Sequence, residues 1–75
     1  MSPALSDLPV RKVTRALEAA GFEQVRMKGS HAVYRRATDG KVVVVPEHGT
    51  LKRGTLASIL RQVGLTPDEF LDLLD

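Results

Sequence analysis

The sequence predicts an α+β domain in which a helix, a three-stranded antiparallel sheet, a second helix and a short third helix follow one another. Apolar residues recur at helical spacing near both ends of the chain, they alternate with polar residues in the middle, and glycine-containing turns separate the alternating runs. Each predicted helix has one apolar stripe. We therefore expect the helices to cover one face of the sheet and the other face to remain open to solvent or a partner.

The length of 75 residues predicts a single domain over residues 1–75, because such a chain has room for only one hydrophobic core. Residues 1–8 lack a hydrophobic period and are expected to form a flexible arm. No apolar run approaches the roughly 20 residues of a membrane span, so we expect no membrane association. Cysteine is absent, which excludes disulfides and thiolate metal sites and favours a reducing, cytoplasmic location.

The first helix is predicted to begin at Val10 and to end at Gly21, which would adopt the left-handed conformation of a helix terminator. Asp7 or a near neighbour is expected to cap its start. The apolar stripe of this helix comprises Val10, Val13, Ala16, Leu17 and Ala20.

A β-hairpin is predicted between residues 24 and 36, with Gly29 and Ser30 as a two-residue type II′ turn. The facing pairs are then Lys28–His31, Met27–Ala32, Arg26–Val33, Val25–Tyr34 and Gln24–Arg35. Opposed residues share a face, so one surface should be core and the other a basic patch around a histidine. The expected core surface comprises Val25, Met27, Ala32 and Tyr34. The expected basic surface comprises Gln24, Arg26, Lys28, His31 and Arg35.

The third strand is predicted over residues 41–46, after a turn at Asp39-Gly40, and its four consecutive valines indicate apolar contact on both faces. A loop with His48 leads to a second helix that starts at Lys52 or Arg53. Gly64 should end that helix. Its apolar stripe comprises Leu56, Ile59, Leu60 and Val63, and a capping box formed by Thr66 and Glu69 should open the short third helix.

Positive charge is concentrated in residues 11–61, which contain all eleven Lys and Arg residues and only four carboxylates, whereas the last residues of the chain are acidic. A positive body of this kind attracts polyanions, of which nucleic acid is the usual one. An ordinary solvated surface of mixed charge is the alternative interpretation.

Several motifs together resemble the HicA (YcfA-like) toxin family. They are Ala20-Gly21-Phe22, Arg26-x-Lys28-Gly29-Ser30-His31, Val45-Pro46-x-His48 and the run from Gly54-Thr55-Leu56 to Gly64-Leu65. The resemblance implies a fold similar to the double-stranded RNA-binding domain. It also implies a type II toxin that acts as a ribosome-independent mRNA interferase, has His31 as its single catalytic histidine, and is neutralised by a HicB-like antitoxin. Arg53 stands where many members have proline.

The chemistry of His31 fits that implication, since a histidine accepts and donates protons near neutral pH. Removing the proton of an RNA 2′-hydroxyl lets this oxygen attack the adjacent phosphate, which yields a cyclic phosphate and a free 5′-hydroxyl without a metal or cofactor. Nearby cations would stabilise the negative charge of the transition state. The expected RNA-binding residues are Arg26, Lys28, Gly29, Ser30, Arg35, Lys52 and Arg53.

Two other functions are compatible with the same residues. The domain could be a non-catalytic RNA-binding module on the same basic face, or a protein-interaction domain for an acidic partner. His48 could be a second acid or base, a phosphate contact or a loop residue, and we favour the loop residue because nothing in the sequence fixes it near His31. Two imidazoles without a cluster of carboxylates or cysteines make a poor metal site, so we expect none.

Overall fold

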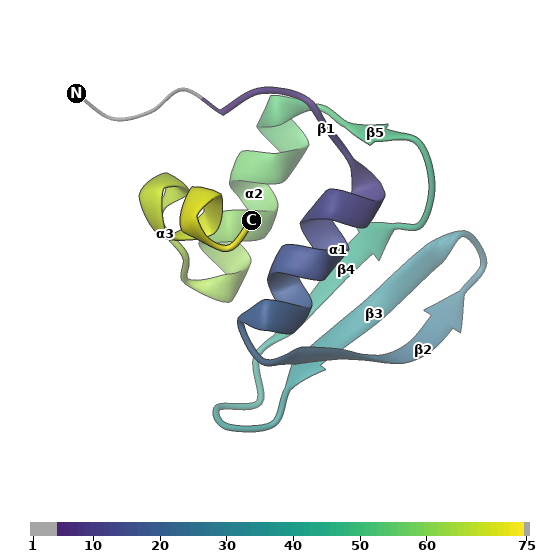
Figure 1. Cartoon of the computed structure of the whole chain (residues 1–75). Coiled ribbons are helices and arrows are strands. Elements are labelled where there is room, and N and C mark those ends of the chain that lie inside the picture. Colours follow the sequence, from purple (N-terminus) through teal and green to yellow (C-terminus); the bar gives the residue numbers. More distant parts are fainter. Residues whose placement is uncertain (1–4, 75) are drawn as a thin grey trace.

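Helices α1 (Val10–Ala19) and α2 (Arg53–Val63) lie on one face of a three-stranded antiparallel sheet in the computed structural model, which describes residues 5–74 (Figure 1). The strands of this sheet, in spatial order, are β2 (Phe22–Lys28), β3 (His31–Arg36) and β4 (Val42–Pro46). The short helix α3 (Pro67–Asp72) packs beside α2. The predicted α+β fold, with its helix, three strands, helix and short helix, is confirmed.

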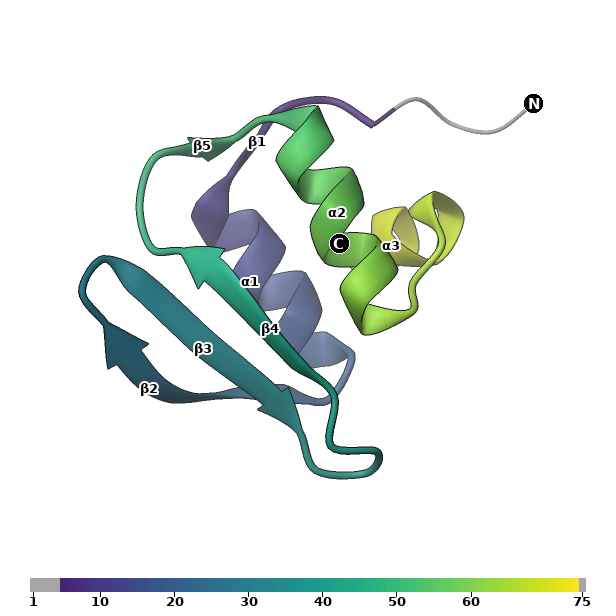
Figure 2. The same cartoon turned by 180° about the vertical axis from the view of Figure 1, so that it is seen from behind.

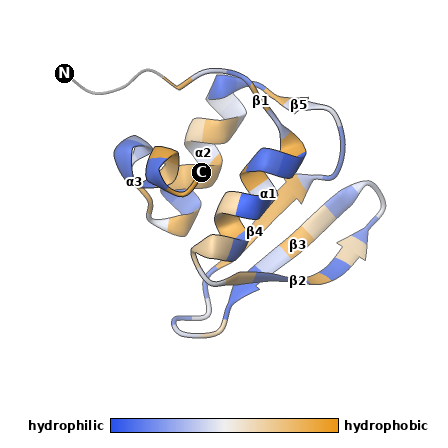
Figure 3. Ribbon diagram, in the orientation of Figure 1, coloured by the Kyte–Doolittle hydropathy of each residue, from blue (hydrophilic) through white to orange (hydrophobic). Residues whose placement is uncertain are grey.

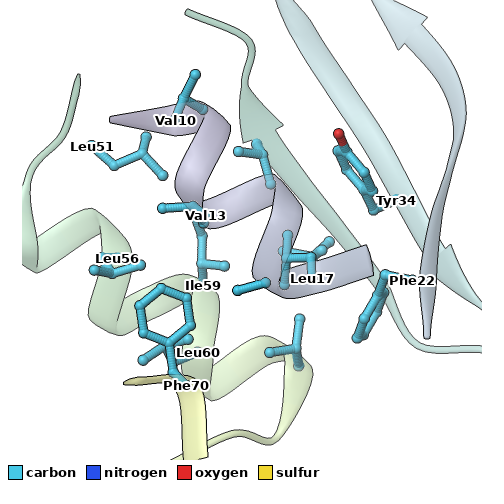
Figure 4. Packing of buried hydrophobic residues seen from close by; sticks show 14 of the residues in the cluster. Val10, Val13, Leu17, Phe22, Tyr34, Leu51, Leu56, Ile59, Leu60 and Phe70 are labelled. Carbon is cyan, nitrogen blue, oxygen red and sulfur yellow. The ribbon is translucent and has the colours of Figure 1, made fainter. Parts of the chain in front are cut away.

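The hydrophobic core lies between the helices and the inner face of the sheet (Figure 4). Leu17 from α1, Leu56 from α2 and Phe70 from α3 are completely buried there. Burial of one such side chain stabilises a fold by about 1.5–3 kcal/mol, so these residues attach all three helices to a common core. The capping box that starts α3 is present as predicted: Glu69 N–H donates to the Thr66 hydroxyl oxygen at 3.1 Å, and Thr66 N–H donates to the Glu69 carboxylate at 2.9 Å.

The β2–β3 hairpin has the predicted register near its turn and a β-bulge farther from it. The confirmed facing pairs are Lys28–His31, Met27–Ala32 and Arg26–Val33. The register then shifts between Gln24 and Arg26, so that Gln24 faces Tyr34 and Glu23 faces Arg35. The predicted pairs Val25–Tyr34 and Gln24–Arg35 are therefore wrong.

The bulge at Val25 allows Phe22 to enter the core. Strict alternation along β2 would put Val25 inside and Phe22 outside. With the extra residue, Phe22 faces Arg36 on the inner side and is only 1% exposed, whereas Val25 is 52% exposed. An aromatic ring removes more apolar area from water than a valine side chain does, so this register is the more stable one.

Two further expectations about burial in the sheet are wrong. Met27 was expected in the core and is 46% exposed, since β2 is an edge strand that projects beyond the helices (Figure 1). Strand β4 was expected to have apolar contact on both faces. Val43 and Val45 are buried, but Val42 and Val44 are about half exposed on a face that no other described element covers (Figure 2).

The start of the described chain is tied to the segment before α2. Strand β1 (Leu8–Pro9) pairs with β5 (Thr50–Leu51), and the Asp7 carboxylate accepts a hydrogen bond of 2.9 Å from the backbone N–H of Arg53. Asp7 therefore caps α2 and not α1, whose N-cap is Pro9 without a side-chain hydrogen bond. The predicted flexible arm does not extend to Asp7 and Leu8, and residues 1–4 lie outside the described residues.

Arg36 links the sheet to the ends of both long helices. Its guanidinium donates to the carboxylate of Asp39, with a shortest distance of 2.7 Å, and to the backbone carbonyls of Ala20 and Val63, each at 3.4 Å. It also lies over the Phe22 ring, 4.7 Å from the ring centroid. The hydrogen bond from Arg36 lowers the pKa of Asp39 to about 2. A cation at two helix C-termini complements their negative dipole ends, so Arg36 has a structural role.

Candidate nucleic-acid interface

The turn between β2 and β3 projects its residues away from the core. Gly29 has a φ of 63°, and no residue other than glycine has a positive φ in the described part of the chain, so the φ of Ser30 is negative. A positive φ at the first central residue only is what a type II′ turn requires. No atom lies within 4 Å of the position that a Cβ would take at Gly29. Glycine is therefore needed here for its backbone conformation and not for space.

His31 begins the central strand, on the open face of the sheet. It faces Lys28 of β2 on one side and Pro46 of β4 on the other. Its side chain is exposed, whereas the next residue, Ala32, is completely buried. Because side chains alternate along a strand, the imidazole lies on the outer face together with Lys28.

The remaining cations of the open face lie at different distances from His31. Arg26 faces Val33, which is two residues beyond His31. Arg35 is four residues beyond His31, about 13 Å along the strand, so it would contact a different part of a polymer. Arg35 also faces Glu23, whose charge was not expected on this surface. The bulge puts Glu23 in the place where Gln24 was predicted.

An apolar strip crosses the same face between the cations, and we define it as Val33, Val42 and Val44. Val33 faces Val44, and Val42 faces Arg35. Val33 is half-buried, while Val42 and Val44 are 50% and 47% exposed. Figure 3 shows the continuous apolar character of β4 beside the mixed character of β2 and β3. The run of four valines in the sequence is the signal for this strip, although only Val43 and Val45 of the run are buried.

The segment Glu47–Gly49 lies against the β2–β3 turn. The backbone N–H of Glu47 donates to the Ser30 carbonyl oxygen at 2.9 Å, which extends the contact between β3 and β4 beyond the last strand pair. At the other end of the segment, the Gly49 carbonyl oxygen accepts a hydrogen bond of 3.0 Å from Val10 N–H at the start of α1. His48 is exposed between these two anchors. The fold thus brings both histidines to one end of the sheet.

The Glu47 side chain lies on the inner side of the sheet, at the end near the β2–β3 turn. One of its carboxylate oxygens, Oε2, is buried and has no hydrogen-bond partner among residues 5–74. Burial and, second, the negative charge of Glu47 raise the pKa of Tyr34, which is 3% exposed on the inner face. The carboxylate is therefore near the phenol and away from the open face.

Lys52 and Arg53 are at the start of α2, in the helix layer, and are not brought together with His31 (Figure 1). Both side chains are exposed. The first backbone amide of α2 already donates to Asp7, which leaves one fewer free amide for an anion at this helix end.

The described residues form no pocket, so a polymeric ligand would lie across an open surface. Within residues 5–74 there is also no group of three or more His, Asp or Glu side chains that could hold a metal ion. None of the helices in this part of the chain is long and apolar enough to cross a membrane.

A protein-family model described as "HicA toxin of bacterial toxin-antitoxin" matches residues 10–65. The match extends from the start of α1, through the whole sheet, to just beyond α2. The chain belongs to the HicA toxin family. Membership makes the protein a toxin of a toxin–antitoxin pair and implies an antitoxin partner. No curated protein sequence in the comparison matches this HicA-family toxin.

Proposed function

We propose that this HicA-family toxin is an endoribonuclease, an mRNA interferase that cleaves RNA without a ribosome and without a metal ion. The observation that carries the proposal is the exposed imidazole of His31 beside Lys28, on a sheet face that no other described element covers. A cytoplasmic toxin of this kind is held inactive by a HicB-like antitoxin.

In the proposed reaction, His31 accepts the proton of an RNA 2′-hydroxyl. The 2′-oxygen attacks the adjacent phosphorus, and the bond from phosphorus to the 5′-oxygen breaks. The products are a 2′,3′-cyclic phosphate and a free 5′-hydroxyl. The ammonium of Lys28 faces His31 across the hairpin and stabilises the negative charge that develops on the phosphoryl oxygens.

RNA binding in this proposal extends from the hairpin turn along the sheet. Gly29 and Ser30 let the phosphate approach the turn closely, and the Ser30 hydroxyl contacts it. Arg26 and Arg35 bind different phosphates along the open face, since Arg26 lies opposite the second residue after His31 and Arg35 is the fourth residue after it. Lys52 and Arg53 contact the RNA backbone only where it reaches the start of α2.

The test compares wild-type protein with His31→Ala for cleavage and binding of one RNA in the presence of EDTA. We expect cleavage to fall by about 10²–10⁴-fold, the usual contribution of a general acid or base, while RNA affinity stays close to wild type. Lys12→Ala, an exposed residue on α1, is the matched control and should leave both unchanged. Undiminished cleavage by His31→Ala would remove His31 from the mechanism. Salt-dependent binding without cleavage by the wild type would favour a non-catalytic RNA-binding module.

The antitoxin in this proposal covers the open face around His31. The apolar strip offers area for burial, and the cations around it suit acidic side chains of a partner placed where phosphates would lie. Adding the cognate antitoxin to the same assay should therefore stop cleavage and RNA binding together. Full cleavage by the saturated complex would contradict occlusion of this face.

A further inference from the structure

His48 is held in place by the backbone on both sides. Glu47 N–H is bonded to the Ser30 carbonyl oxygen, and the Gly49 carbonyl oxygen is bonded to Val10 N–H. Strand β5 follows immediately and pairs with β1. His48 lies in the loop between β4 and β5, as expected, and these contacts hold the chain one residue before it and one residue after it.

His48 follows the end of β4 that pairs with the start of β3, where His31 lies. His31 faces Pro46, and His48 is two residues beyond Pro46. In an antiparallel ladder such a diagonal neighbour lies about 7–8 Å away, within reach of long and aromatic side chains. Glu47, between Pro46 and His48, is half-buried with one carboxylate oxygen completely inside. The pairing of β4 with β3 continues to Glu47, whose N–H is bonded to the Ser30 carbonyl oxygen, and the next residue, His48, is exposed at the same end of the sheet as His31.

Neither the His31 nor the His48 imidazole stabilises the fold through a side-chain hydrogen bond or through burial within residues 5–74. Both side chains are exposed, and the side-chain hydrogen bonds within residues 5–74 involve other residues. Two exposed imidazoles at this spacing can approach opposite sides of a single phosphodiester. One side of that phosphodiester carries the attacking oxygen and the other carries the leaving oxygen.

We propose that His48 is a second catalytic residue, the general acid that donates a proton to the departing 5′-oxygen. This inference rests on the proposed ribonuclease function, and it departs from the single catalytic histidine that the family resemblance implies. His31 takes the proton of the 2′-hydroxyl, the new bond forms between the 2′-oxygen and phosphorus, and the bond to the 5′-oxygen breaks. The His48 imidazolium supplies the proton that turns this oxygen into a hydroxyl. One proton is taken up and one is released, so no water or metal is consumed in the step.

The experiment uses two versions of one RNA oligonucleotide, in which the bond that wild-type protein cuts has either its normal 5′-oxygen or a bridging sulfur. A thiolate leaves without being protonated, because thiols are much more acidic than alcohols. We expect His48→Ala to cut the all-oxygen RNA about 10²–10⁴-fold more slowly than wild type and the sulfur-containing RNA at nearly the wild-type rate. His31→Ala should be slow on both, since the 2′-hydroxyl must lose its proton in either case.

The sulfur-containing RNA also shows whether His48→Ala is folded, because activity on it requires an intact site. Thr50→Ala, an exposed residue of β5, is the matched control and should cut both RNAs like wild type. Equal losses on both RNAs, or no loss on either, would overturn the role of His48 and leave the ribonuclease function standing. Wild-type protein that cuts neither RNA would overturn the proposed function itself.

Discussion

Tyr34 is the only tyrosine of the chain, which contains no tryptophan. Its ultraviolet absorbance therefore reports on the buried side of the sheet. Burial is the main reason why its pKa is raised above 10.0, and the negative charge of Glu47 is the second. A raised pKa means that the folded state holds this proton more tightly than the unfolded chain does. The stability that Tyr34 contributes is therefore complete below about pH 10 and is lost as the pH rises through the folded-state pKa.

We expect Glu47→Gln to lower the pKa of Tyr34 towards 10.0 without reaching it, since burial remains. The ultraviolet absorbance of tyrosinate during an alkaline titration measures this pKa directly. Glu23→Gln is the control, because it removes a carboxylate from the open face and should leave the titration of Tyr34 unchanged. Equal shifts in both variants would show that Glu47 does not lie beside the phenol.

At the scale of elements, hydrophobic periodicity is sufficient for the three helices and for the three strands of the main sheet. It does not predict the short pair β1 and β5, or the positions where tertiary contacts compete with a regular pattern. The period of β2 favours Val25 inside, yet the bulge puts Phe22 there, because burial of the larger side chain outweighs regular pairing. Asp7 is a similar case. A residue near the predicted start of α1 was assigned to that helix, whereas its carboxylate caps a helix that is distant in sequence.

Asp7 is expected to stabilise the fold through the start of α2. Loss of the acceptor in Asp7→Ala should lower the free energy of unfolding by about 0.5–2 kcal/mol, the usual cost of losing a helix cap. Urea denaturation followed by circular dichroism measures the change. Ser6→Ala is the control, since Ser6 is exposed and next to Asp7. If the two variants are equally stable, the hydrogen bond to Arg53 contributes nothing.

At the scale of the whole molecule, the candidate site depends on contacts that no local pattern contains. The hairpin turn and its alternation were sufficient to place His31 and Lys28 on one outer surface. The sequence could not place His48 there, because its position follows from the pairing of β3 with β4 and from the backbone contacts of Glu47 and Gly49. It also could not show how far the helices extend over the inner face of the sheet, which decides that Met27 is exposed.

The proposed mechanism predicts which chemical groups end the two fragments of a cleaved RNA. It is based on the open face, the two histidines and the cations. Mass spectrometry of a defined RNA cut by the wild-type protein in EDTA identifies these ends directly. We predict a 2′,3′-cyclic phosphate on one fragment and a 5′-hydroxyl on the other, since the 2′-oxygen is the nucleophile. A 5′-phosphate on the downstream fragment, or cleavage that stops when divalent metal is removed, would contradict the account.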